Sequence, residues 1–163
     1  MTGEPGRSDL PLTRWQAAAE DYRARQGWSA FCVDTVVWAY PRQFEALNVS
    51  RRLGHLVLAA LGRRAIAVPV IEIPGASARW VFLTRPYLGA AERIVGVFAG
   101  QDVGYAHSLP GSPWVVRLPP TRQPDQAELT WVTSPDVSLP RLSAVARTIQ
   151  QALGGRDPTR RGR

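Results

Sequence analysis

Two spacings of apolar residues recur along this chain, one of about 3.6 residues and one of two residues. The longer spacing predicts helices at 13–27, 50–62, 88–99 and 138–155. Runs of β-branched and aromatic residues predict strands at 29–40, 44–49, 65–73, 79–85, 102–108, 113–119 and 128–133. Groups of strands thus alternate with single helices, which is typical of an α+β fold. We expect a single domain at 13–153, with a mixed β-sheet flanked by about four helices.

Local sequence signals mark the ends of two of these helices. Thr13 and Gln16 have the spacing of a capping box, and Gly27 stands where the first helix should end. Ser50 is a suitable N-cap for the helix at 50–62. Each helix has one apolar face, which we expect to be buried. These faces contain Trp15, Ala18, Ala19 and Tyr22 in the first helix, Leu53, Leu56, Val57, Ala60 and Leu61 in the second, and Leu142, Val145, Ile149 and Leu153 in the last.

The composition is that of a globular protein. A chain of 163 residues, of which 45% are hydrophobic and 20% charged, can bury one core. The Gly, Pro and polar residues at 1–12 predict a flexible arm, and the arginine-rich residues at 154–163 predict a basic disordered tail. No apolar run reaches the roughly eighteen residues of a transmembrane helix, and the first residues lack the apolar stretch of a signal peptide. The single cysteine, Cys32, excludes an intramolecular disulfide. We therefore expect a cytoplasmic protein without a membrane partner.

The positive charge of the chain is unevenly distributed. The formal net charge is +7, and all 20 basic residues are arginines. Residues 51–100 contain seven arginines and two acids, whereas residues 1–50 contain five arginines and six acids. A basic face attracts phosphate-bearing molecules, which indicates DNA or a nucleotide as a partner.

The common catalytic motifs are missing from the sequence. There is no Walker loop, no dinucleotide-binding glycine fingerprint and no serine-hydrolase elbow. Catalysis by two metal ions needs two or three converging carboxylates, but Asp34, Glu45 and Asp102 each stand alone. The sequence motifs therefore indicate no catalytic residue, no metal site and no cofactor.

One short segment is suited to bind an anion. Arg51 and Arg52 follow the Ser50 N-cap, in the first helical turn, where the helix dipole disfavours cations. Backbone N–H groups, a hydroxyl and two guanidinium groups together suit a phosphate. The alternative is that these are ordinary exposed arginines, screened by solvent.

Several blocks of sequence are similar, in order, to a known family. The opening helix runs into "GWSAFCV", and "PGASARWVF" (74–82) follows a turn-and-strand pattern. "DVGY", "VVRLPPT", "ELTW" and "SLPRLSAVARTIQQAL" then occur in the family's order. The chain resembles, over 13–153, the bifunctional DNA primase/polymerase N-terminal domain, or prim-pol domain, of the archaeo-eukaryotic primase superfamily. The resemblance implies a prim-pol-like α+β fold.

The same resemblance implies a degenerate active site. Glu45 and Asn48 stand where the family has its Asp-x-Asp metal motif, and Arg79 stands where the family has a histidine. Ser77 lies at a glycine of the family's turn, and Asp102 is the one acidic residue that remains. We expect these five residues to line a remnant binding cleft without catalysis. The implied role is that of an accessory or regulatory protein in DNA replication that binds nucleic acid or nucleotide.

Two other functions remain open at this point. An active primase/polymerase would hold a divalent metal such as Mg²⁺ on Asp34, Glu45 and Asp102. A protein–protein interaction module would bind a protein partner through exposed aromatic residues such as Trp114 or Trp131.

Overall fold

The structure is a computed structural model and describes residues 11–87, 91–107 and 114–154. The expected α+β class is confirmed, and the described residues contain four α-helices, where we expected about four. Most of the arm expected at 1–12 and of the tail expected at 154–163 lies outside the described residues. Among the described residues, no helix is long and apolar enough to cross a membrane.

The strands form two antiparallel sheets, where we expected one mixed sheet. The order is β1-β2-β7 in the smaller sheet and β6-β3-β5-β4-β8 in the larger one. The helices are α1 (Arg14–Asp21), α2 (Arg51–Arg63), α3 (Ala91–Val97) and α4 (Leu142–Gly154), and a π-helical turn (Tyr22–Gln26) extends α1. The strands are β1 (Ser29–Val33), β2 (Val36–Tyr40), β3 (Glu45–Ser50), β4 (Val70–Ile73), β5 (Arg79–Thr84), β6 (Val103–Ala106), β7 (Val116–Leu118) and β8 (Thr130–Thr133).

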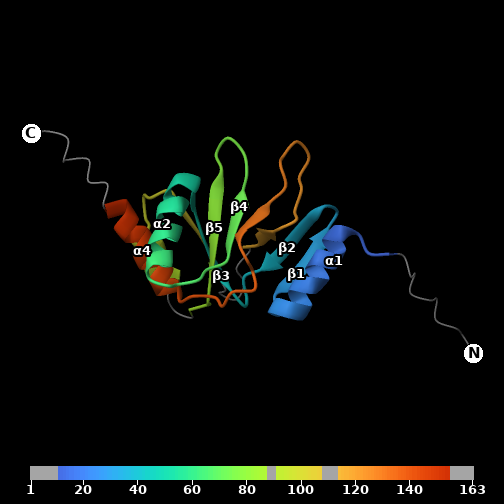
Figure 1. The fold of residues 1–163 in the computed structure, drawn as a ribbon, viewed down its shortest axis with the longest axis horizontal. Helices are drawn as coiled ribbons and strands as arrows, with labels where there is room; N and C mark the ends of the chain where they lie inside the picture. Colours follow the sequence, from blue (N-terminus) through green and yellow to red (C-terminus); the bar gives the residue numbers. More distant parts are fainter. Residues whose placement is uncertain (1–10, 88–90, 108–113, 155–163) are drawn as a thin grey trace, which may run out of the picture.

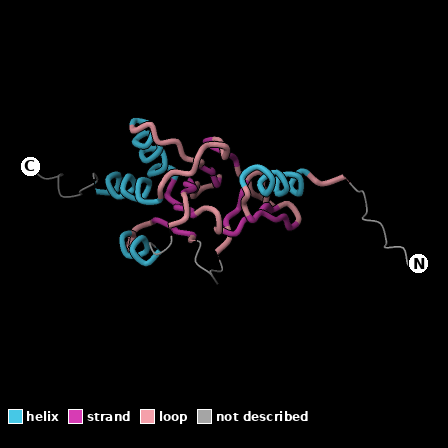
Figure 2. Tube along the Cα trace, turned by 90° about the horizontal axis from the view of Figure 1, so that it is seen from below, coloured by secondary structure: helices cyan, strands magenta, loops and turns pink. Residues whose placement is uncertain are grey.

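The elements are arranged in layers. Helices α2 and α4 pack on each other and on one face of the five-stranded sheet, and α1 lies at the opposite end against β1 and β2 (Figure 1). Figure 2 shows the strands between helices at the two ends of the molecule. The larger sheet is therefore covered by helices on one face and by the smaller sheet on the other.

Strands β3 and β5 lie at the centre and contribute to two cores. Successive side chains of a strand point to opposite faces. Leu47 and Phe82 lie in the core beneath α2 and α4, whereas Ala46 and Val81 lie in the core shared with the smaller sheet and α1. The central pair is thus buried on both sides, which explains its nearly continuous apolar sequence.

The segment 29–40 forms a hairpin and not the single strand that its composition predicts. β1 and β2 pair in register, with Val33 opposite Val36. Asp34 has a φ of 53°, in the left-handed region that aspartate tolerates better than most residues. An Asp-Thr turn flanked by valines therefore reverses the chain within an apparently continuous β-branched run.

Other boundaries differ from the predicted ones for local reasons. The strand expected from residue 65 begins only at Val70, after Pro69, which has no N–H to donate to a sheet. Leu56, expected in the core, is 47% exposed, because α2 turns Val57 and Leu61 toward the sheet. The helix expected at 88–99 is described over Ala91–Val97. The capping box of Thr13 and Gln16 and the Ser50 N-cap are confirmed.

Gly54 lets α2 approach the central strand closely. A Cβ atom built at Gly54 would lie 2.7 Å from Cε3 and 2.9 Å from Cβ of Trp80. Trp80 is 3% exposed and also packs against the ring of His55. The absence of a side chain at this position therefore determines how near the helix lies to β5.

We predict that Gly54→Ala destabilises the protein by about 1–3 kcal/mol, because the added methyl overlaps Trp80 and forces the helix outward. The matched control is Gly62→Ala in the same helix, where a Cβ atom meets nothing within 4 Å. That change should stabilise by up to about 1 kcal/mol through helix propensity. Urea unfolding of the two variants measures both effects. A stabilising Gly54→Ala would contradict the close packing.

Tyr22 connects three parts of the second core through its hydroxyl group. The hydroxyl donates to the Pro119 carbonyl at 2.7 Å and accepts from Nε1 of Trp131 at 2.8 Å. Its ring stacks on Trp28 at 5.5 Å between centroids. Burial raises the pKa of Tyr22 from 10.0 to about 12.

The raised pKa predicts a loss of stability at alkaline pH. Because the folded state holds the Tyr22 proton more tightly, its stabilising effect is complete below pH 10 and decreases as the pH rises from 10 toward 12. Tyr22→Phe should cost about 1–3 kcal/mol at pH 8, since Trp131 and Pro119 lose a buried partner. The gap in stability between the two proteins should narrow above pH 10. Urea unfolding across pH tests this, with exposed Tyr40→Phe as control, and a constant gap would contradict it.

Candidate functional site

Three of the five expected remnant residues meet at one end of the larger sheet. Arg79 of β5 lies opposite Ser50 of β3, and its side chain crosses β3 to reach Asp102, just before β6. Its Nε donates to Oδ1 of Asn48, and its Nη1 lies 2.8 and 2.9 Å from the two carboxylate oxygens of Asp102. Nη2 donates to the main-chain carbonyls of Asn48 and Asp102 at 3.0 and 3.3 Å. The guanidinium therefore joins three neighbouring strands.

These bonds engage every nitrogen of the Arg79 guanidinium. We define Arg79, Asn48 and Asp102 as the arginine clamp. A phosphate would have to displace Asp102 or Asn48 to reach Arg79, so anion binding at this guanidinium would compete with contacts that stabilise the fold. Because the Asp102 side chain is 76% exposed, its ion pair is screened by water, and the carbonyl and amide bonds carry more of the clamp's stability.

Glu45 lies apart from the clamp. It is at the other end of β3, three positions before Asn48. Because side chains alternate across a strand, this odd difference places Glu45 on the opposite face from Asn48, the helix side of the sheet with Leu47 and Val49. Glu45 is 2% exposed. Burial, together with the neighbouring Glu45, raises the pKa of the Tyr105 hydroxyl above its usual value. The expectation that Glu45 lines the same cleft as Asn48 and Arg79 does not match this geometry.

Ser77 lies with the predicted anion-binding residues. A shallow hollow of about 590 Å³ is lined by the turn at 75–78 and by Ser50, Arg51, Arg52 and His55. Much of its binding capacity is already used: Arg51 forms an ion pair with Glu72 at 3.2 Å, and its N–H donates to the Ala78 carbonyl at 3.0 Å. The Ser50 hydroxyl accepts from the N–H of Leu53 at 3.3 Å. Arg52 is exposed at the rim.

The carboxylates required for a polymerase do not converge. Asp34 is in the β1–β2 turn, Glu45 is on the helix side of β3, and Asp102 is held by Arg79. Among the described residues, no group of three or more His, Cys, Asp or Glu side chains is close enough to hold a metal ion. The clamp does not fit Mg²⁺, since it offers one carboxylate, whose oxygens already face a guanidinium.

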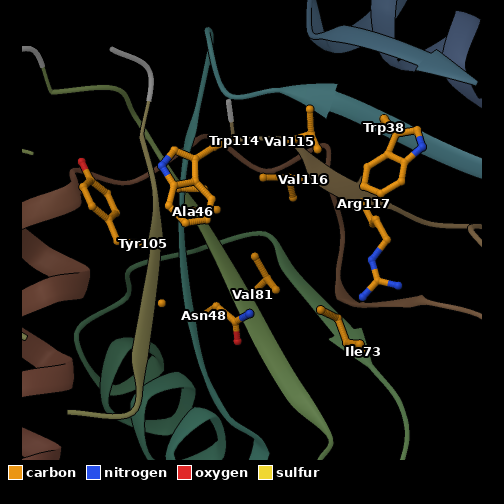
Figure 3. A pocket seen from close by; sticks show the side chains of 12 residues that line it. Trp38, Ala46, Asn48, Ile73, Val81, Tyr105, Trp114, Val115, Val116 and Arg117 are labelled. Atoms are coloured by element: carbon orange, nitrogen blue, oxygen red, sulfur yellow. The ribbon is translucent and has the colours of Figure 1, made fainter. Parts of the chain in front are cut away.

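A cleft between the two sheets is the feature that the sequence did not reveal. Its volume is about 250 Å³. We call it the inter-sheet cleft. It is lined by residues of β3, β6 and β7 with single contributions from β2, β4 and β5, and its larger or polar members are Trp38, Tyr105, Trp114, Asn48 and Arg117. Figure 3 shows the two indoles on opposite sides, Trp38 beside Arg117 and Trp114 near Ala46, with Asn48 at another edge.

The strand pairing explains how the cleft is built. Trp38 of β2 lies directly opposite Arg117 of β7, so the two side chains emerge from the same face of the smaller sheet, the face opposite to the one that buries Val116 in the second core. Nη1 of Arg117 donates to Oε1 of Gln123, which orients the guanidinium. Asn48 belongs both to this cleft and to the clamp. Trp114 is 49% exposed, whereas Trp131, the other tryptophan expected at a surface, is half-buried in the second core.

Only the pairing of distant strands could have located this cleft. Residues 38 and 117 are far apart in the sequence, and neither has a motif around it. The one available signal was that a tryptophan and an arginine each occur within a segment predicted to be a strand, where side chains alternate between the two faces of a sheet. Comparisons with protein-family models, with curated proteins and with solved structures found no match for this chain.

We predict that Arg79→Gln lowers the free energy of unfolding by about 1–3 kcal/mol, because hydrogen bonds to Asn48 and two carbonyls are lost. Arg51→Gln, which removes a single exposed ion pair, should cost less than about 1 kcal/mol. Urea unfolding at low salt and at about 1 M salt compares the two variants. The effect at Arg79 should persist at high salt, and equal effects at the two positions would contradict the clamp.

Proposed function

We propose that this protein is a nucleic-acid- or nucleotide-binding domain of the accessory or regulatory kind, and that the inter-sheet cleft receives a base. The observation that carries the proposal is the placement of two tryptophans on either side of one cavity, with an arginine and an asparagine at its edges (Figure 3). An indole face stacks on any nucleobase, and an amide can bond to a base edge.

The size and charge of the surroundings support this function. The cavity, of about 250 Å³, lies just below the range of roughly 300–1,000 Å³ that is typical of ligand pockets, which suits a single base better than a larger ligand. Arg117 supplies a positive charge at the same opening, and the protein as a whole carries +7. A net positive charge steers phosphate-bearing ligands toward the protein.

The arginine clamp supports a binding role over a polymerase role. In the prim-pol family that the sequence resembles, the corresponding region carries out metal-dependent chemistry. Here an internal cation, the guanidinium of Arg79, faces the Asp102 carboxylate. A positively charged side chain at that carboxylate opposes the binding of a divalent cation there. The fold's cleft would then retain a ligand without assembling a metal centre.

The proposal predicts that a short single-stranded oligodeoxynucleotide binds and quenches tryptophan fluorescence. Trp114→Ala should weaken its affinity by about tenfold through loss of stacking. Arg117→Gln should also weaken it and reduce the dependence of affinity on salt, because one cationic contact is removed. Fluorescence anisotropy at several salt concentrations measures both effects, and a set of mononucleotides tests whether a single base suffices.

Two control variants make the result specific to the cleft. Tyr40→Ala removes an aromatic residue of similar exposure, 41%, and Arg122→Gln removes an exposed arginine, and neither residue lines the cleft. Both should bind as the parent protein does. Absence of oligonucleotide and nucleotide binding at low salt would overturn the proposal. Equal loss in the control variants would assign the binding to overall charge instead.

A further inference from the structure

A second cavity, of about 520 Å³, lies at the N-terminal end of α4 and is surrounded by arginines. Arg85 follows β5, Arg93 is on α3 and Arg141 precedes α4, so three different elements each contribute one. The remaining lining residues are Pro86, Tyr87, Ile94, Leu142 and Ser143. We call this feature the three-arginine cavity. None of its described lining residues is shared with the inter-sheet cleft.

No described carboxylate balances these charges. The six ion pairs in the described part of the chain involve Arg14, Arg23, Arg25, Arg51 and Arg79, and none involves a residue of the three-arginine cavity. The described lining residues likewise include no acid. Three like charges around one hollow repel one another, and an anion between them would remove that repulsion.

The backbone holds two of the arginines side by side. Arg85 and Arg141 form an isolated parallel bridge, in which the N–H of Arg85 donates to the Pro140 carbonyl at 2.8 Å. Nε of Arg85 donates to the Leu139 carbonyl at 2.8 Å, which orients its guanidinium. Like charges at paired positions are destabilising, so an anion bound between Arg85 and Arg141 would stabilise this pairing.

Neutral donors line the same cavity. Ser143 and Tyr87 are exposed and carry hydroxyl groups. Helix α4, of 13 residues, begins at Leu142, so the positive end of its dipole is at the cavity wall. Buried Leu142 and Ile94 anchor this wall in the first core. Guanidinium and hydroxyl groups are donors whose hydrogen bonds phosphate oxygens accept.

The contrast with the hollow at Ser50 decides between the two anion-site candidates. There, Arg51 is paired with Glu72, and the Ser50 hydroxyl is bonded within the helix. At the three-arginine cavity, by comparison, the charges are not paired with described acids. From this geometry we infer that the three-arginine cavity is a binding site for a phosphate-bearing ligand with more than one negative charge. Such phosphates can belong to a free polyphosphate or nucleotide, or to the backbone of a nucleic acid.

The test uses inorganic tripolyphosphate and the full chain. Isothermal titration calorimetry should show binding to the parent protein, and the double variant Arg93→Gln/Arg141→Gln should weaken it by about tenfold or more, since two charge-assisted contacts are lost. Arg85 is left unchanged, because its side chain also donates a hydrogen bond to the Leu139 carbonyl and its loss could disturb the fold. Circular dichroism confirms that the variant is folded, as both substituted side chains are exposed.

A second double variant controls for net charge. Arg63→Gln/Arg147→Gln removes the same two charges from exposed positions on α2 and α4 that lie outside the cavity. Its affinity for tripolyphosphate should stay within about twofold of the parent value, because net charge acts weakly at a distance in salt. No tripolyphosphate binding by the parent protein, or equal losses in the two double variants, would overturn the inference.

A parallel titration identifies the source of the phosphate. If Arg93→Gln/Arg141→Gln weakens a single-stranded oligonucleotide as much as it weakens tripolyphosphate, the site serves a nucleic-acid backbone. If only tripolyphosphate is weakened, the ligand is a free phosphate compound. Trp114→Ala, which alters the inter-sheet cleft, should leave tripolyphosphate binding unchanged. A failure of the cleft proposal is thereby distinguishable from a failure of this one.

Discussion

Burial of the β3–β5 pair on both faces is the constraint on which the rest of the structure depends. One face packs under α2 and α4, and the other packs against the smaller sheet. Because side chains alternate across a strand, each residue of this pair is committed to one core or the other. The close approach of α2 at Gly54 and Trp80 holds the first core to the sheet. The hydroxyl of Tyr22 connects the second core to the loop at Pro119.

The same constraint places the polar residues of the two sheets. Asn48 points toward the smaller sheet and so belongs to the inter-sheet cleft, while Glu45 points toward the helices. At the end of the pair, Arg79 spreads across β3 and bonds to Asp102. The Arg79 guanidinium bonds to Asn48 of β3 and to the carbonyl and carboxylate of Asp102. It therefore stabilises the fold, and other side chains are left to bind a ligand. The two proposed binding regions, the inter-sheet cleft and the three-arginine cavity, accordingly use other arginines.

Much of the fold was accessible to sequence reasoning, and the site was accessible only in part. The helix starts at Thr13 and Ser50 were predicted because capping is local chemistry. The hairpin at Asp34 was missed because an Asp-Thr turn is a weak signal within a β-branched run. The meeting of Asn48, Arg79 and Asp102 was expected from the resemblance to the prim-pol domain, whereas Glu45 was expected there too and lies on the other face. Counting positions along β3 would have separated Glu45 from Asn48, since they differ by an odd number.

The sequence by itself determined the α+β class, the helix caps and the periodic faces that are buried. These properties depend on residues a few positions apart, so they can be inferred without knowledge of the fold. Tertiary structure alone decided that the strands divide into two sheets and that Trp38 faces Arg117. It also decided that Arg85, Arg93 and Arg141 surround one cavity. The physical reason is that strand pairing and helix packing join distant segments, and the register of those contacts is determined by the burial of whole faces.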